Sequence, residues 1–320
     1  MKSYPMRIAV VIPCYNVEQH VEVALRSILD QTYPDLDVYA VDDGSTDGTR
    51  AKLAELERKY PGTFRWTSGP RRGACAARNE GLARTSGDYV QFLDADDAIL
   101  TDKLHRQADI ARTQGHPDLV VGDFLNVYED GREEKIVGLG KDPWMALVRT
   151  QLGTTSANLF KREALNRVNG WREEQASSQD YELMFRILAA GSEVRWDPHV
   201  SSLVLKRMQG SISRTGQRDN WVRYIHLRRA IREHLRSVDP IQFRQEIAAT
   251  DQFLFMAIRV LAKHDPTAAF MEFRRTMPPG FEPDRTSATT PLYSACFRVV
   301  GFRGTEWLST AFGRFKYRKH

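Results

Sequence analysis

Residues 87–97 read Gly-Asp-Tyr-Val-Gln-Phe-Leu-Asp-Ala-Asp-Asp, a short apolar run that ends in a dense group of carboxylates. Residues 90–93 predict a buried strand, so Asp94, Asp96 and Asp97 crowd at its carboxyl end. Their mutual repulsion must be offset by a cation or by hydrogen-bond donors. Because alternate residues at a strand end can point the same way, Asp94 and Asp96 could face one divalent ion and the diphosphate that it bridges. A solvated acidic turn is the alternative, since an isolated Asp-x-Asp is a short pattern.

The same organisation, an apolar β-branched run followed by a polar turn and a helical pattern, occurs twice earlier in the chain. Residues 7–12 (Arg-Ile-Ala-Val-Val-Ile) end in the turn 13–16 (Pro-Cys-Tyr-Asn), and residues 37–41 run into the turn 42–49. Strands that alternate with helices predict an α/β sheet, and such sheets bind ligands at the carboxyl ends of their strands. The three polar turns are therefore expected to meet over one crevice.

These turns and their neighbours resemble the family 2 glycosyltransferases, which are inverting enzymes with the GT-A fold. Four motifs carry the resemblance, in the family's order and at its usual separations: residues 11–16 (Val-Ile-Pro-Cys-Tyr-Asn), 41–47 (Val-Asp-Asp-Gly-Ser-Thr-Asp), 73–79 (Gly-Ala-Cys-Ala-Ala-Arg-Asn) and 94–97 (Asp-Ala-Asp-Asp). The resemblance covers roughly residues 6–213. It implies an α/β, Rossmann-like mixed sheet flanked by helices, the GT-A nucleotide-diphospho-sugar transferase fold. It also implies transfer of a sugar from a nucleotide-diphosphate donor, usually a UDP-sugar, to a hydroxyl of a glycan or glycolipid, with inversion at the anomeric carbon.

The resemblance assigns a donor site to the turns. Pro13, Tyr15 and Asp43 would form the pocket for the nucleotide base, where a carboxylate accepts the ring N–H. Arg78 would line the same site. The alternative for Asp43 is structural, because it and its neighbours could merely build a tight turn. Arg71 or Arg72 either reinforces the donor site, or both are solvated loop charges.

The resemblance also implies a divalent cation, Mn²⁺ or Mg²⁺, at the acidic turn. Asp94, Ala95 and Asp96 would bind the nucleotide sugar, with Asp96, and Asp94 beside it, ligating the metal. The cation would stabilise the departing diphosphate. Gln209 stands about where the family often has a metal-binding histidine. An amide oxygen is a poor ligand by comparison, so the basic residues 206–207 could neutralise part of the diphosphate instead.

The acceptor half of the reaction needs a base, and residues 177–188 resemble the helix that carries the family's acidic pair. Asp180 is at the position of the catalytic base, which we expect at the exposed start of the helix; a helix cap is the alternative. Gln179 replaces the commoner Glu, which removes one source of a raised pKa for Asp180. On the acceptor side, Trp171 could stack on a sugar face or fill the core, and Glu173 lies in the same turn.

The chain changes character near residue 213, which predicts a catalytic domain over residues 1–213 and a basic helical region over residues 214–320. The second region has 19 Lys and Arg against 10 Asp and Glu, a net charge of +9, which leaves −4 for the first 213 residues. One helix is expected to bury an apolar stripe and to carry arginines on the opposite face. The stripe is Tyr224, Leu227, Ile231 and Leu235, and the arginines are Arg223, Arg229, Arg232 and Arg236. The basic, aromatic end of the chain fits either peripheral contact with the anionic inner membrane surface or a helical subdomain with a solvated basic face.

Cysteine usage and the remaining motifs bear on compartment and on other functions. Three cysteines without paired spacing, and no signal-peptide core at the start, predict a cytoplasmic protein. A nucleotidyltransferase is an alternative, but residues 13–16 lack the glycine and lysine of a phosphate loop. A nucleic-acid-binding protein is a weaker alternative, because the acidic crevice would repel phosphate. We therefore expect a sugar donor and a glycan or lipid-linked acceptor as partners, and no nucleic acid.

Overall fold

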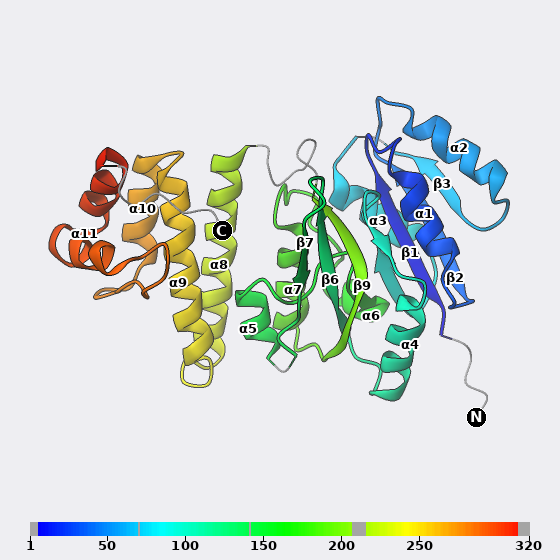
Figure 1. The fold of residues 1–320 in the computed structure, drawn as a ribbon. Helices are drawn as coiled ribbons and strands as arrows, with labels where there is room; N and C mark the ends of the chain where they lie inside the picture. Colours follow the sequence, from blue (N-terminus) through cyan, green and yellow to red (C-terminus); the bar gives the residue numbers. More distant parts are fainter. Residues whose placement is uncertain (1–5, 70, 141, 207–215, 313–320) are drawn as a thin grey trace. The chain divides into compact units, whose positions relative to one another are not determined.

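The computed structural model describes residues 6–69, 71–140, 142–206 and 216–312. The chain forms two compact units, residues 1–212 and residues 213–320. The first unit contains a nine-stranded sheet in the order β3-β2-β1-β4-β8-β6-β9-β5, with β7 paired to β6, and the described part of the second unit is helical (Figure 1).

The first half of the sheet is parallel and follows the predicted alternation of strands and helices. Its strands are β1 (Ile8–Cys14), β2 (Leu36–Asp42), β3 (Arg65–Ser68) and β4 (Tyr89–Phe92), and its helices are α1 (Val21–Leu29), α2 (Thr49–Lys59) and α3 (Ala74–Arg84). β1 lies between β2 and β4 and runs parallel to both. Residues 8–12 of β1 are completely buried, which explains their continuous apolar run: a parallel strand is covered on both faces.

The second half of the sheet is mixed. It contains β5 (Ala98–Ile99), β6 (Leu119–Tyr128), β7 (Glu133–Ile136), β8 (Leu159–Lys161) and β9 (Val194–Lys206), with helices α4 (Lys103–Thr113), α5 (Pro143–Val148), α6 (Arg162–Arg167) and α7 (Gln179–Ala189). β8 runs antiparallel to both β4 and β6 and so joins the two halves. β6 and β9 are parallel, with a register shift near Asp123. The α/β mixed-sheet prediction is therefore confirmed.

Helix α3 packs closely on the central strand because it carries a glycine at the contact. A Cβ at Gly81 would lie 2.3 Å from Cγ1 of Val11, so no larger residue fits without movement. Branched Val11 cannot easily turn away, since a β-branched side chain has few allowed rotamers. This contact sets the distance between β1 and the helix that carries Arg78.

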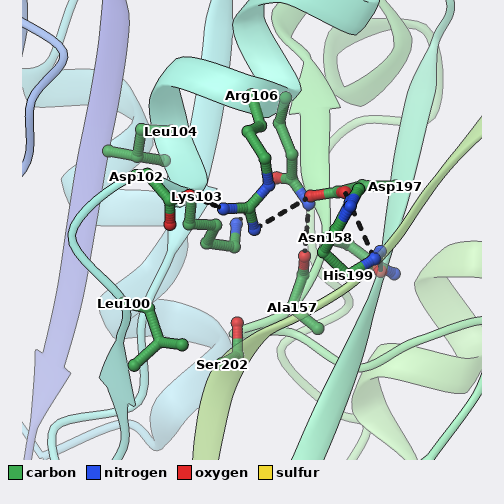
Figure 2. A network of polar contacts seen from close by, with 12 residues as sticks. Leu100, Asp102, Lys103, Leu104, Arg106, Ala157, Asn158, Asp197, His199 and Ser202 are labelled. Carbon is green, nitrogen blue, oxygen red and sulfur yellow. Dashed lines mark hydrogen bonds and ion pairs between the residues drawn. The ribbon is translucent and has the colours of Figure 1, made fainter.

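A buried polar network lies between α4 and the sheet (Figure 2). Lys103 is completely buried, and its ammonium donates to Gln91 and, at 2.8 Å, to Gln107. One turn later, Arg106 pairs with Asp102 and lies 3.4 Å from the buried carboxylate of Asp197. The network satisfies polar groups that burial would otherwise leave unpaired.

The second unit is built from α8 (Gln217–Val238), α9 (Arg244–Ala262), α10 (Pro266–Thr276) and α11 (Pro291–Phe312), the last with a kink at Gly301. Phe255 is at the centre of its aromatic core. The prediction that Arg232 faces solvent is wrong: its guanidinium is buried and donates to Asp251 at 2.5 Å and to the carbonyl of Thr276 at 2.8 Å. The pattern of one helix does not reveal a buried carboxylate on another helix. Here Asp251 of α9 binds Arg232 of α8.

Among the described residues, no helix combines the length and the apolar character that crossing a bilayer requires.

Candidate active site

The first two polar turns touch each other at the carboxyl ends of β1 and β2. Cys14 pairs with Asp42 across the two strands. Beyond this pair, the amide of Asn16 donates to Oγ of Ser45 at 3.0 Å, and Oδ1 of Asn16 accepts from the amide of Thr46 at 2.8 Å. Asn16 has a left-handed backbone (φ 51°), a conformation that asparagine tolerates better than most residues. Reciprocal hydrogen bonds therefore fix the turn that carries Tyr15.

Asp43 is buried and holds the start of α3. Its Oδ1 accepts from the amide of Arg72 at 2.9 Å and its Oδ2 from the amide of Gly73 at 2.6 Å. Asp42, by contrast, braces its own turn, because it accepts from the amide of Ser45 at 3.1 Å and pairs with Arg50 at 2.7 Å. Asp43 thus has a structural role, although each of its oxygens keeps a second lone pair for another donor.

Tyr15 is the exposed member of the proposed base pocket. Its side chain is 37% exposed, and the guanidinium carbon of Arg71 lies 4.7 Å from the centre of its ring. Pro13 is half-buried at the end of β1. An aromatic ring held at the mouth of a strand-end turn offers a stacking surface for a base, and Arg71 already uses it for a cation–π contact.

The acidic turn after β4 is divided between structural and accessible carboxylates. Asp97 is buried, with Oδ2 accepting from Ser156 at 2.6 Å and Oδ1 from the amide of Leu205 at 3.0 Å. Burial raises the pKa of Asp97 well above its ordinary value, and the charges of Asp94 and Asp96 add to this. Those two carboxylates are half-buried, so they, rather than Asp97, are the ones that a ligand can reach. Ala95 between them is buried.

Arg78 is a buried cation that connects the acidic turn to α7. Its Nη2 lies 2.7 Å from Oδ1 of Asp94, and its Nη1 donates to Oε1 of Gln179 at 2.8 Å. The guanidinium carbon lies 4.5 Å from the centre of the Trp171 ring. The single guanidinium therefore contacts residues 94, 171 and 179, which the sequence separates widely.

Trp171 and Glu173 lie in the turn that Asn79 holds on α3. The side chain of Asn79 donates to the carbonyl of Trp171 at 2.8 Å and accepts from its amide at 2.9 Å. The Trp171 ring is buried and packs edge-on against Phe92, which favours its core role over stacking on a sugar. Glu173 is exposed and lies 3.6 Å from Arg72 of the donor-side loop.

Asp180 is in the first turn of α7, after Ser178, whose backbone is left-handed (φ 55°). The expectation of an exposed base is wrong: the residue is half-buried. Burial raises the pKa of Asp180, an effect that the bond from the amide of Tyr181 and the charge of Arg78 reduce and the charge of Asp94 increases. A carboxylate with a raised pKa suits general base chemistry. The N-cap position belongs to Ser178, so Asp180 is not the cap residue.

The part of the chain that the structure describes contains no metal site made by histidine, cysteine, aspartate and glutamate side chains alone. Across residues 6–69, 71–140, 142–206 and 216–312, no group of three or more histidine, cysteine, aspartate or glutamate side chains is placed to hold a metal ion. A divalent cation that also binds the diphosphate of the substrate needs only one or two protein carboxylates. The acidic turn is therefore compatible with such a cation. Gln209, the predicted doubtful ligand, lies outside the described residues.

Two contacts in this region were missed in the sequence. Ser156 binds the acidic turn across 59 residues, and Gln179 binds Arg78 across 101 residues. No local pattern signals either contact. Only the strand order, with β8 beside β4, could have indicated that the segment before β8 reaches the acidic turn.

Comparison with known proteins agrees with this geometry. The family model for Glycosyl transferase family 2 matches residues 9–168, half of the chain. The amylovoran biosynthesis glycosyltransferase AmsB of Erwinia amylovora is 32% identical over 191 residues, which cover 56% of this chain and 62% of that protein. The chain spans about half the length of the curated relatives that it matches, with 53%, 63% and 42% for three of them.

Two solved structures show the same fold. S. aureus TarS 1–349, in complex with UDP-GlcNAc, has a TM-score of 0.68 and 19% identity, covering 98% of this chain and 93% of that chain. The mannosyltransferase PcManGT from Pyrobaculum calidifontis, in complex with GDP-Man and Mn²⁺, has a TM-score of 0.55 and 19% identity, covering 98% and 89%. The nucleotidyltransferase and nucleic-acid-binding alternatives are not favoured. The strand-end turns, the mixed sheet and the family match together show that the chain belongs to glycosyl transferase family 2 and has the GT-A fold.

Proposed function

We propose that this family 2 protein is a glycosyltransferase that transfers a sugar from a nucleotide-diphosphate donor, a UDP-sugar, to a hydroxyl of a glycan or glycolipid, with inversion at the anomeric carbon. The supporting observation is the position of Arg78, which contacts Asp94 of the acidic turn and Gln179, the neighbour of Asp180. Donor-side and base-side residues of the first unit, proposed as the catalytic domain over residues 1–213, thus share one buried cation. The UDP-GlcNAc complex of TarS supports UDP as the nucleotide.

Binding of the donor is assigned to the first two turns. The base would stack on the ring of Tyr15 beside Pro13, and its imide N–H would donate to Asp43. Arg71 would have to leave the face of Tyr15 if the base uses that face. Since uracil presents an N–H where cytosine presents an acceptor, a carboxylate at this place selects the former.

Asp180 is proposed as the base that takes the proton of the acceptor hydroxyl. Its raised pKa makes it a stronger base than an exposed aspartate. The hydroxyl oxygen attacks the anomeric carbon from the face opposite the diphosphate, whose bond to that carbon breaks with the electron pair going to the phosphate oxygen. This single displacement inverts the centre and requires no covalent bond to the enzyme. Glu173, on the exposed turn, is proposed to face the acceptor.

A divalent cation, Mn²⁺ or Mg²⁺, is proposed at the acidic turn. Its protein ligands would be Asp96 and the second oxygen of Asp94, because one oxygen of Asp94 is paired with Arg78. Carboxylate oxygens suit such hard ions. When bound, the cation stabilises the negative charge that develops on the leaving diphosphate. The Mn²⁺ in the PcManGT complex supports this proposal.

The donor proposal is tested by thermal unfolding with UDP, GDP and their sugars, each with and without Mn²⁺. A ligand that binds only the folded protein raises its Tm with the logarithm of ligand concentration. We expect a rise with UDP and UDP-sugars that needs Mn²⁺, and a smaller rise in Asp43→Ala. An unchanged Tm with every nucleotide would refute the proposed donor site. A rise with GDP and GDP-sugars alone would show that the donor nucleotide is GDP and not UDP.

The acceptor is proposed to be a glycan or a lipid-linked saccharide on the cytoplasmic side of the inner membrane, with the helical unit in peripheral contact with anionic lipid. Leu292, Val299 and Trp307 of α11 are exposed, and residues 214–320 have a net charge of +9. Apolar side chains together with excess positive charge suit an anionic lipid surface. Co-sedimentation with phosphatidylcholine vesicles, with and without phosphatidylglycerol, tests this: binding should need the anionic lipid and weaken in Trp307→Ala and in high salt. If the protein sediments with neither type of vesicle, the proposed membrane contact is contradicted.

A further inference from the structure

The amide of Gln179 is held in one orientation by two hydrogen bonds. Its Nε2 donates to the carbonyl of Gln175 at 2.9 Å, so its Oε1 is the atom that faces Arg78, at 2.8 Å from Nη1. An amide and a carboxylate have the same shape, but only the amide can donate to a carbonyl while it accepts from a guanidinium. Both bonds therefore require glutamine, and glutamate would set an oxygen against the carbonyl of Gln175.

The charges around Arg78 explain why glutamine and glutamate at position 179 would differ in effect. The guanidinium is almost completely buried, and the groups that face it are Asp94 at 2.7 Å and, at longer range, Asp180. Cys75 on the same helix is near too, but burial raises its pKa to about 11, so its thiol is neutral at physiological pH. A glutamate at position 179 would be a third carboxylate around one cation. In a buried site, such crowding raises the pKa of the carboxyl groups.

We propose that Gln179 is a positioning residue, which fixes Arg78 without neutralising it, so that the positive charge of Arg78 acts on Asp94 and Asp180 alone. This rests on the proposed function, in which Asp180 is the base. The resemblance predicts a glutamate at position 179, where this chain has glutamine. Because Gln179 is neutral, Asp180 stays ionised at lower pH than it would beside a glutamate. The enzyme is thereby expected to work further into the acidic range than its Gln179→Glu variant.

Three variants test the proposal. Gln179→Glu adds the third carboxylate. Gln175→Glu is the matched control, because the Gln175 side chain also donates to a backbone carbonyl, that of Ser177 at 2.7 Å, and has no contact with Arg78 in the described structure. Gln179→Met keeps the length and the neutrality of the side chain but cannot hold Arg78. For each protein we measure the UDP released from the UDP-sugar that stabilises the enzyme most, as a function of pH, and the affinity for UDP with Mn²⁺.

In Gln179→Glu, the acidic limb of kcat should move upward by about one pH unit, which is about tenfold in rate on that limb, with activity recovered at higher pH. Gln175→Glu should leave the limb in place. Gln179→Met should lower kcat and UDP affinity and should move the limb less than Gln179→Glu, because it frees Arg78 but adds no carboxylate. Identical limbs in the two glutamate variants, or a Gln179→Met enzyme equal to wild type, would overturn the proposal.

Failure of this proposal can be distinguished from failure of the proposed function. If Asp180→Asn is inactive and the limb in Gln179→Glu does not move, only the role of Gln179 is refuted. If Asp180→Asn turns over normally, the base assignment falls first, whatever the Gln179 variants do. If Gln179→Glu does not fold, the Gln179→Met measurement still decides whether this residue positions Arg78.

Discussion

The hydroxyl of Ser156 donates to Asp97 at 2.6 Å and, through the same oxygen, accepts from the amide of Asp94 at 3.2 Å. One buried side chain ahead of β8 thus holds the acidic turn at both of its ends. We expect Ser156→Ala to lower the free energy of unfolding by about 1–3 kcal/mol, because it leaves the buried Asp97 carboxyl and the half-buried amide of Asp94 short of a partner. Urea unfolding at neutral pH measures this.

A matched control exists for this substitution. Ser202 is also buried, and its hydroxyl donates to the carbonyl of Ser156, which Gln91 binds as well. Ser202→Ala should therefore cost less, about 1 kcal/mol or below. Equal losses in the two variants would show that the Ser156 hydroxyl has no special part in holding the turn.

Asp180→Asn should abolish sugar transfer and leave donor binding intact. The amide cannot accept the proton of the acceptor hydroxyl, and loss of a general base lowers rates by about 10²–10⁴-fold. Isothermal titration with UDP and Mn²⁺ gives the binding, and UDP release in the presence of acceptor gives the rate. Glu174→Gln, which changes an exposed carboxylate six positions earlier, is the control and should match wild type. A variant that loses binding along with turnover would move Asp180 from the base to the donor site.

Lys103 makes the stability of the first unit depend on pH above neutrality. Burial lowers its pKa to about 7 from 10.5, an effect that the charge of Asp197 reduces and that of Arg106 increases. Between these two pH values the unfolded chain binds a proton that the folded protein does not. The free energy of unfolding should therefore rise with pH over this window, by up to about 1.4 kcal/mol per unit from this residue.

Lys103→Met removes the titrating group and should flatten that rise. Urea unfolding of both proteins at pH 7, 8 and 9 isolates the contribution of Lys103, since every other group titrates in both. The comparison uses the slope with pH and not the absolute stability, because the variant also loses the bonds of Lys103 to Gln91 and Gln107. Parallel pH profiles would refute the lowered pKa.

Buried and exposed ion pairs in the helical unit should differ strongly in their contributions to the free energy of unfolding. Arg232 and Asp251 form a buried pair, so Arg232→Met leaves Asp251 with only the longer contact to Arg236, at 3.7 Å, and should cost about 3–5 kcal/mol. Arg298 and Glu282 are 2.6 Å apart but 58% exposed, and Arg298→Met should cost less than about 1 kcal/mol. Thermal unfolding of the full chain compares them, and equal shifts in Tm would contradict the ranking.

Most of the fold was predictable because strand and helix periodicity are local properties. The apolar run of β1 and the regular spacing of buried residues in α1 identify both elements without knowledge of the rest. The mixed half of the sheet was less accessible, since β8 has only three residues and its two antiparallel partners are distant in sequence. Family resemblance rather than periodicity predicted the GT-A type.

The candidate site was predictable as a set of residues and less so as a set of interactions. Sequence placed Asp43, Asp94 and Asp180 at strand or helix ends, where the structure has them. It could not show that Asp180 is half-buried, because burial there depends on segments distant in sequence, such as α3, whose Arg78 contacts the start of α7 across 101 residues. The burial of Arg232 was missed for the same reason: a helical pattern gives the direction of a side chain, whereas its partner lies on another helix.

Asn16 and Ser178 place non-glycine residues in left-handed backbone next to Tyr15 and just ahead of Asp180. Such a conformation costs about 1–2 kcal/mol per residue and persists only where surrounding bonds enforce it. Both loops are thus set in shape before any sugar nucleotide arrives, and little chain entropy remains to be lost when it does. Glycine at position 178 would relieve the backbone strain but loosen the segment that carries Asp180, so thermal stability gained there should be accompanied by slower turnover. Glycine at position 16 would also remove the bond from the amide of Thr46, so no such gain is expected there.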